Sequence, residues 1–305
     1  MQINHYALYF SAEQVASAHN DASLPPFQEA WDALRDRQPA GPLDFAFRYR
    51  FLDEMASAER ALGGLLRQAN AGLREGSPIK RASTFVMFLQ AFEMVRDAPI
   101  LESSERAAWL DYAAAETDAL LRVGEQPLHE SLWFNLVRLA SAIVLERAEQ
   151  AQDAAEEFER VIRDEVRPQG HMGRVVGGED GGSLFRQIDA TTALVLTAEA
   201  GETIGLPLWE IDVRGVSALT AALLPHYYFY DTRKWKWDRG VDPEGIQSRF
   251  HRYGGYLEIA NRRSPNKDIQ VVLEDLRPLN TPLAGGWTTL SHGVVEKKKR
   301  RGLFG

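Results

Sequence analysis

A chain of 305 residues, 45% of them hydrophobic, can bury a large core without help from metals or disulfides. It contains no cysteine, which excludes disulfides, thiolate metal sites and cysteine nucleophiles. The formal net charge of −8 argues against a nucleic-acid partner, because phosphate binding depends on clustered Lys and Arg.

Glycine and proline breaks separate stretches with helical periodicity, so we expect a mostly helical chain. Residues 1–52 are expected to form an irregular segment with one short helix over residues 27–37. A longer amphipathic helix is predicted over residues 53–74.

Two long helices are predicted over residues 83–96 and 104–123, and we expect them to pair as an antiparallel hairpin. Two amphipathic helices follow over residues 130–149 and 151–166. The glycine-rich run at residues 173–182 then predicts a long irregular loop.

The next predicted helix, residues 184–204, is apolar on nearly every side, which is typical of a helix buried at the centre of a bundle. Gly205 ends it, in the position that a C-terminal cap favours. A last helix is predicted over residues 246–263, and the Gly254-Gly255 pair is able to interrupt it. Residues 264–305 are expected to be strand or coil. Their end carries the basic run Lys297-Lys298-Lys299-Arg300-Arg301.

Seven or eight helices joined by short turns, with no strong signal for parallel strands, indicate an all-α chain of stacked helical hairpins. We assign this helical body to residues 53–263. Residues 1–52 precede it as an N-terminal segment, and residues 264–305 follow as a C-terminal extension.

No apolar run reaches the roughly 18 residues that a membrane-spanning helix requires, so no membrane span is expected. The first residues lack the pattern of a secretory leader. We expect a periplasmic or secreted protein if a leader was removed, and a cytoplasmic one otherwise. No nucleotide-binding, nucleophile-elbow or helical zinc motif is present, so neither a cofactor nor a metal is expected.

Four landmarks follow one another between residues 128 and 209, in the order helix start, amphipathic helix, turn and post-helix element. They are Leu128-His129-Glu130-Ser131-Leu132-Trp133, Phe158-Glu159-Arg160-Val161-Ile162, Val166-Arg167-Pro168-Gln169-Gly170-His171-Met172 and Gly205-Leu206-Pro207-Leu208-Trp209. In this order they resemble the alginate lyase superfamily, which has an Asn-Asn-His-x-x-Trp element, a Pro-Asp-Gly turn and a Gly-x-x-Leu-Trp element. The resemblance covers residues 80–263.

The resemblance implies an incomplete (α/α) toroid that cleaves uronic-acid polymers by β-elimination. The sequence departs from the family at the catalytic positions. The family's Asn-His pair falls on His129 and Glu130, and its Arg and Tyr fall near Glu179 and Arg186. The catalytic residues of the family are therefore not kept in type.

β-Elimination at a uronate requires groups that neutralise the C6 carboxylate, a base for the C5 proton and an acid for the leaving oxygen. This chain carries suitable side chains at two helix starts, on the glycine-rich loop and near the last helix. The predicted catalytic residues are His129, Glu130, His171, Arg174 and Tyr253, with Tyr253 moving protons. The predicted substrate-binding residues are Arg186, Trp235, Lys236, Trp237, Arg252 and Tyr256.

Structural roles remain open for several of these residues. Arg186 lies on an apolar helix and needs a partner, and an ion pair with Asp189 or Glu130 is favoured over substrate contact. Trp235 and Trp237 are as compatible with a core position as with stacking on a sugar ring.

The leading hypothesis is a polysaccharide lyase that acts on an acidic exopolysaccharide, with an acidic polysaccharide or oligosaccharide as the partner. One alternative is a glycoside hydrolase on the same scaffold, which would use Glu130 with Asp180 or Asp238. A second is a non-catalytic polysaccharide-binding protein of an exopolysaccharide system. The sequence leaves the substrate, the oligomeric state and export open.

Overall fold

The computed structural model describes residues 3, 5–73, 76–178 and 180–295, and this part of the chain is all-α. Its elements are fourteen α-helices and four short 3₁₀-helices, and its only β-type pairings are isolated bridges. None of the described helices is long and apolar enough to cross a membrane. The all-α prediction is confirmed.

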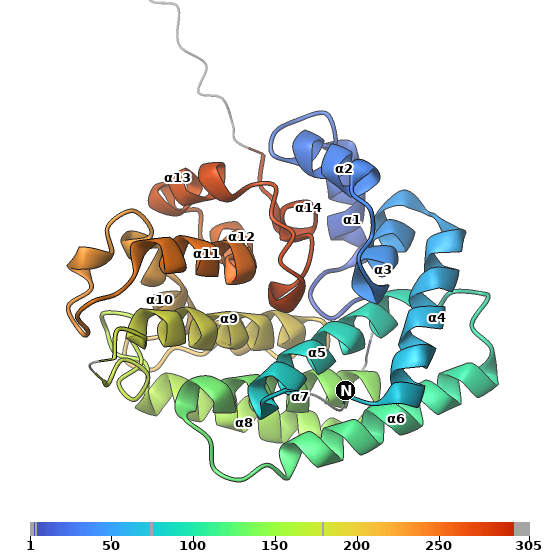
Figure 1. Ribbon diagram of the computed structural model, residues 1–305, viewed down its shortest axis with the longest axis horizontal. Helices are drawn as coiled ribbons and strands as arrows, with labels where there is room; N and C mark the ends of the chain where they lie inside the picture. The colour runs from blue at the N-terminus through green and yellow to red at the C-terminus, as the bar shows by residue number, and fades with distance from the viewer. Residues whose placement is uncertain (1–2, 4, 74–75, 179, 296–305) are drawn as a thin grey trace, which may run out of the picture.

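Four helices form an inner layer, in which each helix packs against the next (Figure 1). These are α3 (Pro42–Leu52), α5 (Pro78–Val95), α7 (Leu128–Val144) and α9 (Ser183–Glu202). Three helices alternate with them along the chain and pack outside: α4 (Met55–Ala71), α6 (Ser103–Leu121) and α8 (Ala148–Asp164). This alternation of inner and outer helices produces the predicted incomplete (α/α) toroid.

The difference between inner and outer helices follows from their sequences. In α8 only one stripe is buried, formed by Ala151, Ala154, Phe158, Val161 and Ile162. In α9, by contrast, nearly every side chain is buried, as its apolar sequence predicts. Gly205 follows α9 with a φ of +73°, and the Leu206 amide bonds the Gly201 carbonyl at 2.9 Å. Gly205 therefore ends the helix as predicted.

The first 52 residues are more regular than the sequence pattern suggested. They contain α1 (Ala12–Asn20), α2 (Phe27–Asp36) and α3, and Phe47 and Phe51 of α3 are fully buried. The buried hydrophobic residues form one packed cluster, whose first member is Ala7 and whose last is Leu290. The N-terminal segment is therefore part of the same packed body as the inner helices.

The expectation of strand or coil after residue 264 was wrong for the described residues. Asn266 caps α13 (Lys267–Leu276), because its side chain accepts from the amides of Asp268 and Ile269. The buried residues of α13 are Ile269, Val272, Leu273 and Leu276. Their spacing is helical, but short apolar runs of this kind are ambiguous in a sequence. The basic run at residues 297–301 lies outside the described residues.

The last of the described helices packs against the first two helices. The short helix α14 (Thr288–His292) packs against α1, α2 and α12 (Gly255–Arg263). As predicted, Gly254 separates α11 (Pro243–Tyr253) from α12. A β-carbon on Gly255 would overlap the Ala284 carbonyl and the Thr281 hydroxyl, so this close approach requires glycine. The break between α11 and α12 sets the direction of α11 above the inner layer (Figure 1).

Candidate active site

The inner cavity, of about 320 Å³, lies where the first turns of the inner helices meet α11. Its lining residues come from four helices that are far apart in the sequence. They are Ile79, Lys80 and Ser83 of α5, His129, Glu130 and Trp133 of α7, Asp189 of α9, and Arg249, Arg252 and Tyr253 of α11. The helical layers thus bring polar groups together at one end of the toroid.

Helix ends contribute to the electrostatics of this cavity. Lys80 is in the first turn of α5, and His129 and Glu130 are in the first turn of α7. The N-terminus of a helix carries a partial positive charge and free amide donors, which favour a negatively charged group nearby. The inner cavity is therefore a favourable place for an anion even before its side chains are considered.

A buried ion pair joins α9 to α11 in the cavity. The Arg249 guanidinium donates to the carboxylate of Asp189, which is 5% exposed. Burial raises the pKa of Asp189 to about 6, although Arg249 and Arg252 oppose this shift. The Oδ1 atom of Asp189 has no hydrogen-bond partner within the described part of the chain. Asp189 is therefore ionised at neutral pH and holds Arg249 in place.

Tyr253 lies against two guanidinium groups. The Cζ atom of Arg249 is 4.6 Å from the centre of the Tyr253 ring, and that of Arg252 is 5.5 Å from it. Burial and the Asp189 carboxylate raise the pKa of Tyr253, and the two arginines only partly offset this. The phenol is therefore protonated at neutral pH, and the cations beside it would stabilise the phenolate that remains after a proton is donated.

His129 differs from Tyr253 in the direction of its pKa shift. Burial lowers its pKa, and the charges of Arg186 and Arg249 lower it further. The imidazole is therefore neutral at pH 7 and is able to accept a proton. The nearest carboxylate oxygen, Oε1 of Glu130, is 4.0 Å from its Nε2 atom. The cavity thus contains one group suited to accept a proton and one suited to donate a proton.

The balance of charge in the cavity is positive. Lys80, Arg249 and Arg252 are opposed by Glu130 and Asp189. Asp189 is paired with Arg249, while neither Lys80 nor Arg252 has a carboxylate within 4.0 Å in the described residues. Two cations are therefore free to meet an anionic ligand.

The structure brings four of the predicted site residues together: His129, Glu130, Arg252 and Tyr253. Arg186 does not line the cavity, but it is close enough to lower the pKa of His129. Its guanidinium binds the Asp180 carboxylate at 2.8 Å and 3.0 Å and the carbonyls of Val175 and Gly177. Arg186 is therefore ion-paired as favoured, but with Asp180 rather than with Asp189 or Glu130, and it fixes the glycine-rich loop to α9.

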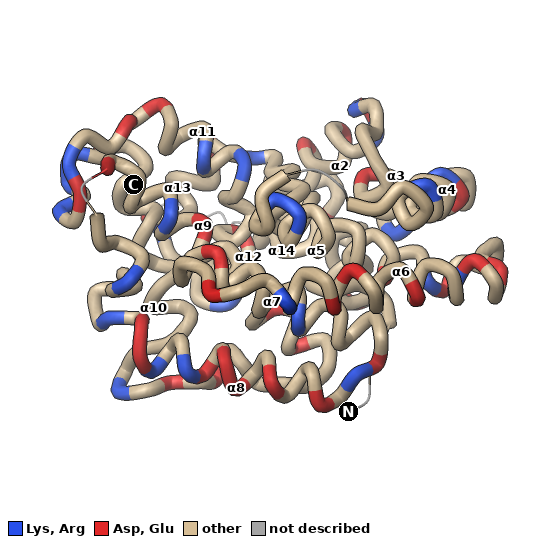
Figure 2. The backbone as a smooth tube through the Cα atoms, turned by 60° about the horizontal axis from the view of Figure 1, so that its bottom comes forward, with Lys and Arg blue, Asp and Glu red and all other residues tan. Residues whose placement is uncertain are grey.

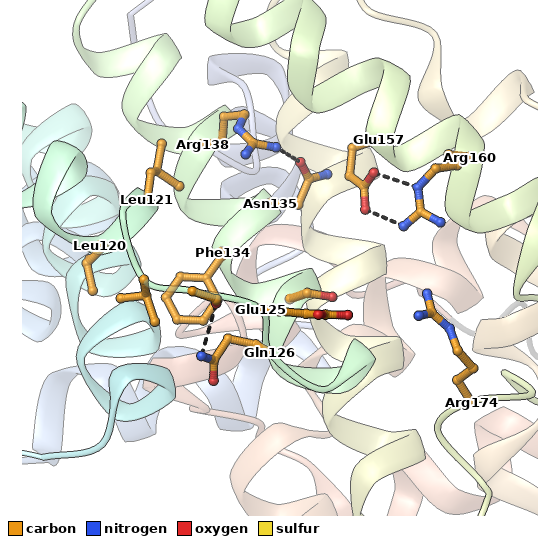
Figure 3. Close-up of a pocket in the computed structure, with 13 residues that line it drawn as sticks. Leu120, Leu121, Glu125, Gln126, Phe134, Asn135, Arg138, Glu157, Arg160 and Arg174 are labelled. Carbon is orange, nitrogen blue, oxygen red and sulfur yellow. Dashed lines mark hydrogen bonds and ion pairs between the residues drawn. The ribbon is translucent and has the colours of Figure 1, made fainter.

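Arg174 lines a different pocket, of about 460 Å³, on the other face of α7 (Figure 3). Its guanidinium binds Glu165 at 2.6 Å and 2.8 Å. Arg160 in the same pocket binds Glu157 through two contacts of 2.7 Å. Arg138 also lines this pocket and contacts the Asn135 amide oxygen, and Glu125 lines it as well. With two of its three arginines paired and a further acidic residue in its lining, this larger pocket is less cationic than the inner cavity. The predicted grouping of Arg174 with His129 and Tyr253 is not found.

The predicted aromatic contacts lie outside the inner cavity. The His171 ring contacts the Trp237 ring in a tilted arrangement with ring centres 4.4 Å apart, and the Lys236 ammonium is 4.7 Å from the centre of the Trp237 ring. Trp235 is buried and donates to the Ser183 hydroxyl at 2.8 Å. These residues form a separate cluster beside the start of α9.

Tyr256 is fully buried in α12. A polymer cannot reach it, so the predicted substrate contact is incompatible with the structure. The reason is the break at Gly254, which places Tyr253 and Tyr256 on different helices.

Neither proposed partner of Glu130 for a hydrolase lines the inner cavity. Asp180 is exposed and paired with Arg186, and this pair together with the Gly182 amide lowers the pKa of Asp180 to about 2. The Asp238 carboxylate accepts from the amides of Gly181, Ser183 and Arg239. The second carboxylate of the cavity is instead Asp189.

Three charged side chains that line the cavity were not predicted as site residues: Lys80, Asp189 and Arg249. Asp189 could have been found from its position, because a carboxylate on an almost wholly apolar helix requires a partner or a function. Nothing in the sequence marks Lys80, since a lysine in the first turn of a helix is common on surfaces.

Comparison with solved structures gives the same architecture. Alginate lyase A1-III from Sphingomonas species A1 superimposes with a TM-score of 0.71 at 14% identity, over 88% of this chain and 78% of that one. An alginate lyase from Bacteroides ovatus superimposes with a TM-score of 0.71 at 12% identity, over 95% of this chain and 99% of that one. This chain has the alginate lyase fold.

A variant of the Sphingomonas alginate lyase in complex with a tetrasaccharide also superimposes, with a TM-score of 0.71 and 14% identity over 90% of this chain and 82% of that one. No protein-family model matches the sequence, and no curated protein matches it. The alginate lyase fold is thus shown by three-dimensional similarity.

Proposed function

We propose that this protein is a polysaccharide lyase that cleaves a uronic-acid-containing polysaccharide by β-elimination in the inner cavity. The observation that carries the proposal is the opposite tuning of His129 and Tyr253 inside one cationic cavity. The pKa of His129 is lowered and that of Tyr253 is raised, so at neutral pH one is a free base and the other a protonated acid.

The first requirement of the reaction is neutralisation of the C6 carboxylate of the sugar. Lys80 and Arg252 are available for this role because neither is paired with a carboxylate in the part of the chain described. The N-termini of α5 and α7 add positive potential at the same place. When these groups neutralise the C6 carboxylate, they stabilise the negative charge that develops as the C5 proton leaves, so this proton becomes more acidic.

The second requirement is a pair of proton transfers. His129 takes the C5 proton, and the electron pair of the broken C5–H bond forms the C4=C5 double bond. The C4–O bond breaks as this double bond forms, its electron pair stays on the leaving oxygen, and that oxygen receives the phenolic proton of Tyr253. Arg249 and Arg252 stabilise the phenolate until a proton returns to it from water, and His129 releases its proton to water. Asp189 keeps Arg249 in position throughout.

A glycoside hydrolase is a second candidate, favoured by one observation. Glu130 and Asp189 line the same cavity, and burial raises the pKa of Asp189 to about 6, the direction expected for a general acid. The close ion pair with Arg249 opposes this role, because it holds the carboxylate in its charged form.

Incubation with alginate, polyglucuronate and hyaluronate separates the candidates. A lyase produces an unsaturated sugar that absorbs ultraviolet light, whereas a hydrolase produces reducing ends without this absorbance. A rise that is lost in Tyr253→Phe and kept in Tyr227→Phe supports the lyase, since Tyr227 is an exposed tyrosine outside the cavity. Reducing ends without absorbance would favour the hydrolase. If the protein binds a polysaccharide but forms neither product, it is a polysaccharide-binding protein without catalytic activity.

A further inference from the structure

A second basic cavity lies directly before α11. It has a volume of about 460 Å³ and is formed by the segment between residues 232 and 243. Three cationic side chains line it: Arg233, Lys236 and Arg239. All three are exposed, and none has a role in the inner cavity. We call it the basic cavity.

Arg233 is already paired with the Asp231 carboxylate at 2.8 Å, which leaves Lys236 and Arg239 as the unpaired cations of the basic cavity. Asp238 also lines it, but Asp238 is buried and accepts from the amides of Gly181, Ser183 and Arg239 at 3.1, 3.0 and 2.8 Å. Lys236 and Arg239 have no carboxylate within 4.0 Å among residues 3, 5–73, 76–178 and 180–295. Their charges are therefore available to a ligand.

Hydrogen bonds attach the segment that carries Lys236 and Arg239 to the start of α9. Trp235 lies in the wall of the cavity, is 3% exposed and donates to the Ser183 hydroxyl at the start of α9. The Asp238 contacts attach the same segment to Gly181 and Ser183. The basic cavity is thus fixed to α9, the helix that supplies Asp189 to the inner cavity.

The two cavities are also connected along α11. Pro243, the first residue of α11, lines the basic cavity, and Arg249 lines the inner cavity. Arg249 is six positions after Pro243 in the helix, a rise of about 9 Å. Lys and Arg mark α11 and the chain near it (Figure 2). The helix α11 therefore begins at the basic cavity and carries Arg249 and Arg252 of the inner cavity.

We propose that the basic cavity binds a further carboxylate of the same acidic polysaccharide whose reacting uronate occupies the inner cavity. This inference rests on the proposed function, because it takes the polyuronate as the ligand. A polymer with one carboxylate on each sugar presents negative charges at regular intervals, so a chain held in the inner cavity carries further carboxylates for the cations of the basic cavity. Lys236 and Arg239 then contribute to polymer affinity and to retention of the chain, and not to the chemical step.

The test compares two double variants with the same change in charge. Lys236→Gln with Arg239→Gln removes the free cations of the basic cavity. Arg60→Gln with Arg67→Gln removes two exposed cations from α4, on the opposite side of the molecule from α11 (Figure 1). The KM and kcat of each are measured with a long polyuronate and with a uronate trisaccharide, and the affinity for the long polymer is measured directly.

We expect the first double variant to raise the KM and the dissociation constant for the long polymer roughly fivefold, with kcat unchanged and the trisaccharide unaffected. The α4 variant should match the wild type. Equal polymer affinity in both variants would overturn the inference while leaving the proposed function intact. A wild-type protein that neither cleaves nor binds any polyuronate would instead overturn the proposed function, and this inference with it.

Discussion

Arg249 of α11 donates a hydrogen bond to the buried carboxylate of Asp189 on α9, and its guanidinium also lies against the Tyr253 ring. One cation thus links a structural carboxylate to the proposed proton donor. Because α9 is the most deeply buried inner helix and α11 lies after the glycine-rich loop, this contact fixes the two sides of the inner cavity relative to each other.

Asp189 should make stability depend on pH in a defined direction. Its pKa is raised from 3.8 to about 6 in the folded protein, so the unfolded chain loses its proton first as the pH rises. Below about pH 4 this difference in pKa adds on the order of 3 kcal/mol to the free energy of unfolding. The added stability is lost as the pH rises to about 6. Asp189→Asn lacks this titration. Urea unfolding of both proteins should therefore show the wild type losing stability relative to the variant over this range, and parallel curves would contradict the assignment.

Tyr253→Phe should remove the proton donor and keep the fold. We expect kcat to fall by roughly 10²-fold or more, with a small change in KM, because the ring still packs against Trp133 and the arginines. Tyr227→Phe serves as the matched control. A variant at residue 253 that keeps wild-type kcat would show that another group protonates the leaving oxygen.

The dependence of kcat/KM on pH should report both proton-transfer groups. Burial, with Arg186 and Arg249, lowers the pKa of His129, so activity should rise with pH and reach half its maximum below pH 6.5. Burial raises the pKa of Tyr253, so the loss of activity at alkaline pH should begin above 10. An acid limb centred above 6.5, or one unchanged in a residually active His129→Gln variant, would argue against His129 as the base.

Much of the architecture could be predicted from the sequence, because periodicity reports burial directly. The helix α9 could be predicted because its residues are apolar on nearly every side. Its end could be predicted because glycine readily adopts the positive φ that Gly205 has in the structure. The helix α13 was missed because a short run of Ile, Val and Leu fits a strand as well as a helix.

The site was only partly predictable, because which face of a helix a residue occupies depends on packing. Ser131 and Glu130 are neighbours in α7, yet Ser131 lines the pocket of Arg174 and Glu130 lines the inner cavity. A sequence does not reveal this division, so Arg174 was grouped with Tyr253 although α7 stands between their pockets.

Gly255 should be essential to the junction between α11 and α12. A β-carbon there would overlap the Ala284 carbonyl and the Thr281 hydroxyl. We expect Gly255→Ala to destabilise the protein by about 1–3 kcal/mol, visible as a lower Tm. Gly124→Ala is the control, because its β-carbon would meet nothing within 4 Å. Equal Tm values for the two variants would show that the 281–284 segment moves away without cost.

The most direct test of the central claim is the mass of the products released from a uronate polymer by the wild-type protein. β-Elimination in the inner cavity predicts oligosaccharides whose new non-reducing end is unsaturated, one water lighter than a hydrolysis product, and predicts that Tyr253→Phe releases them more slowly by roughly 10²-fold or more. Products that all carry saturated ends would contradict the lyase mechanism.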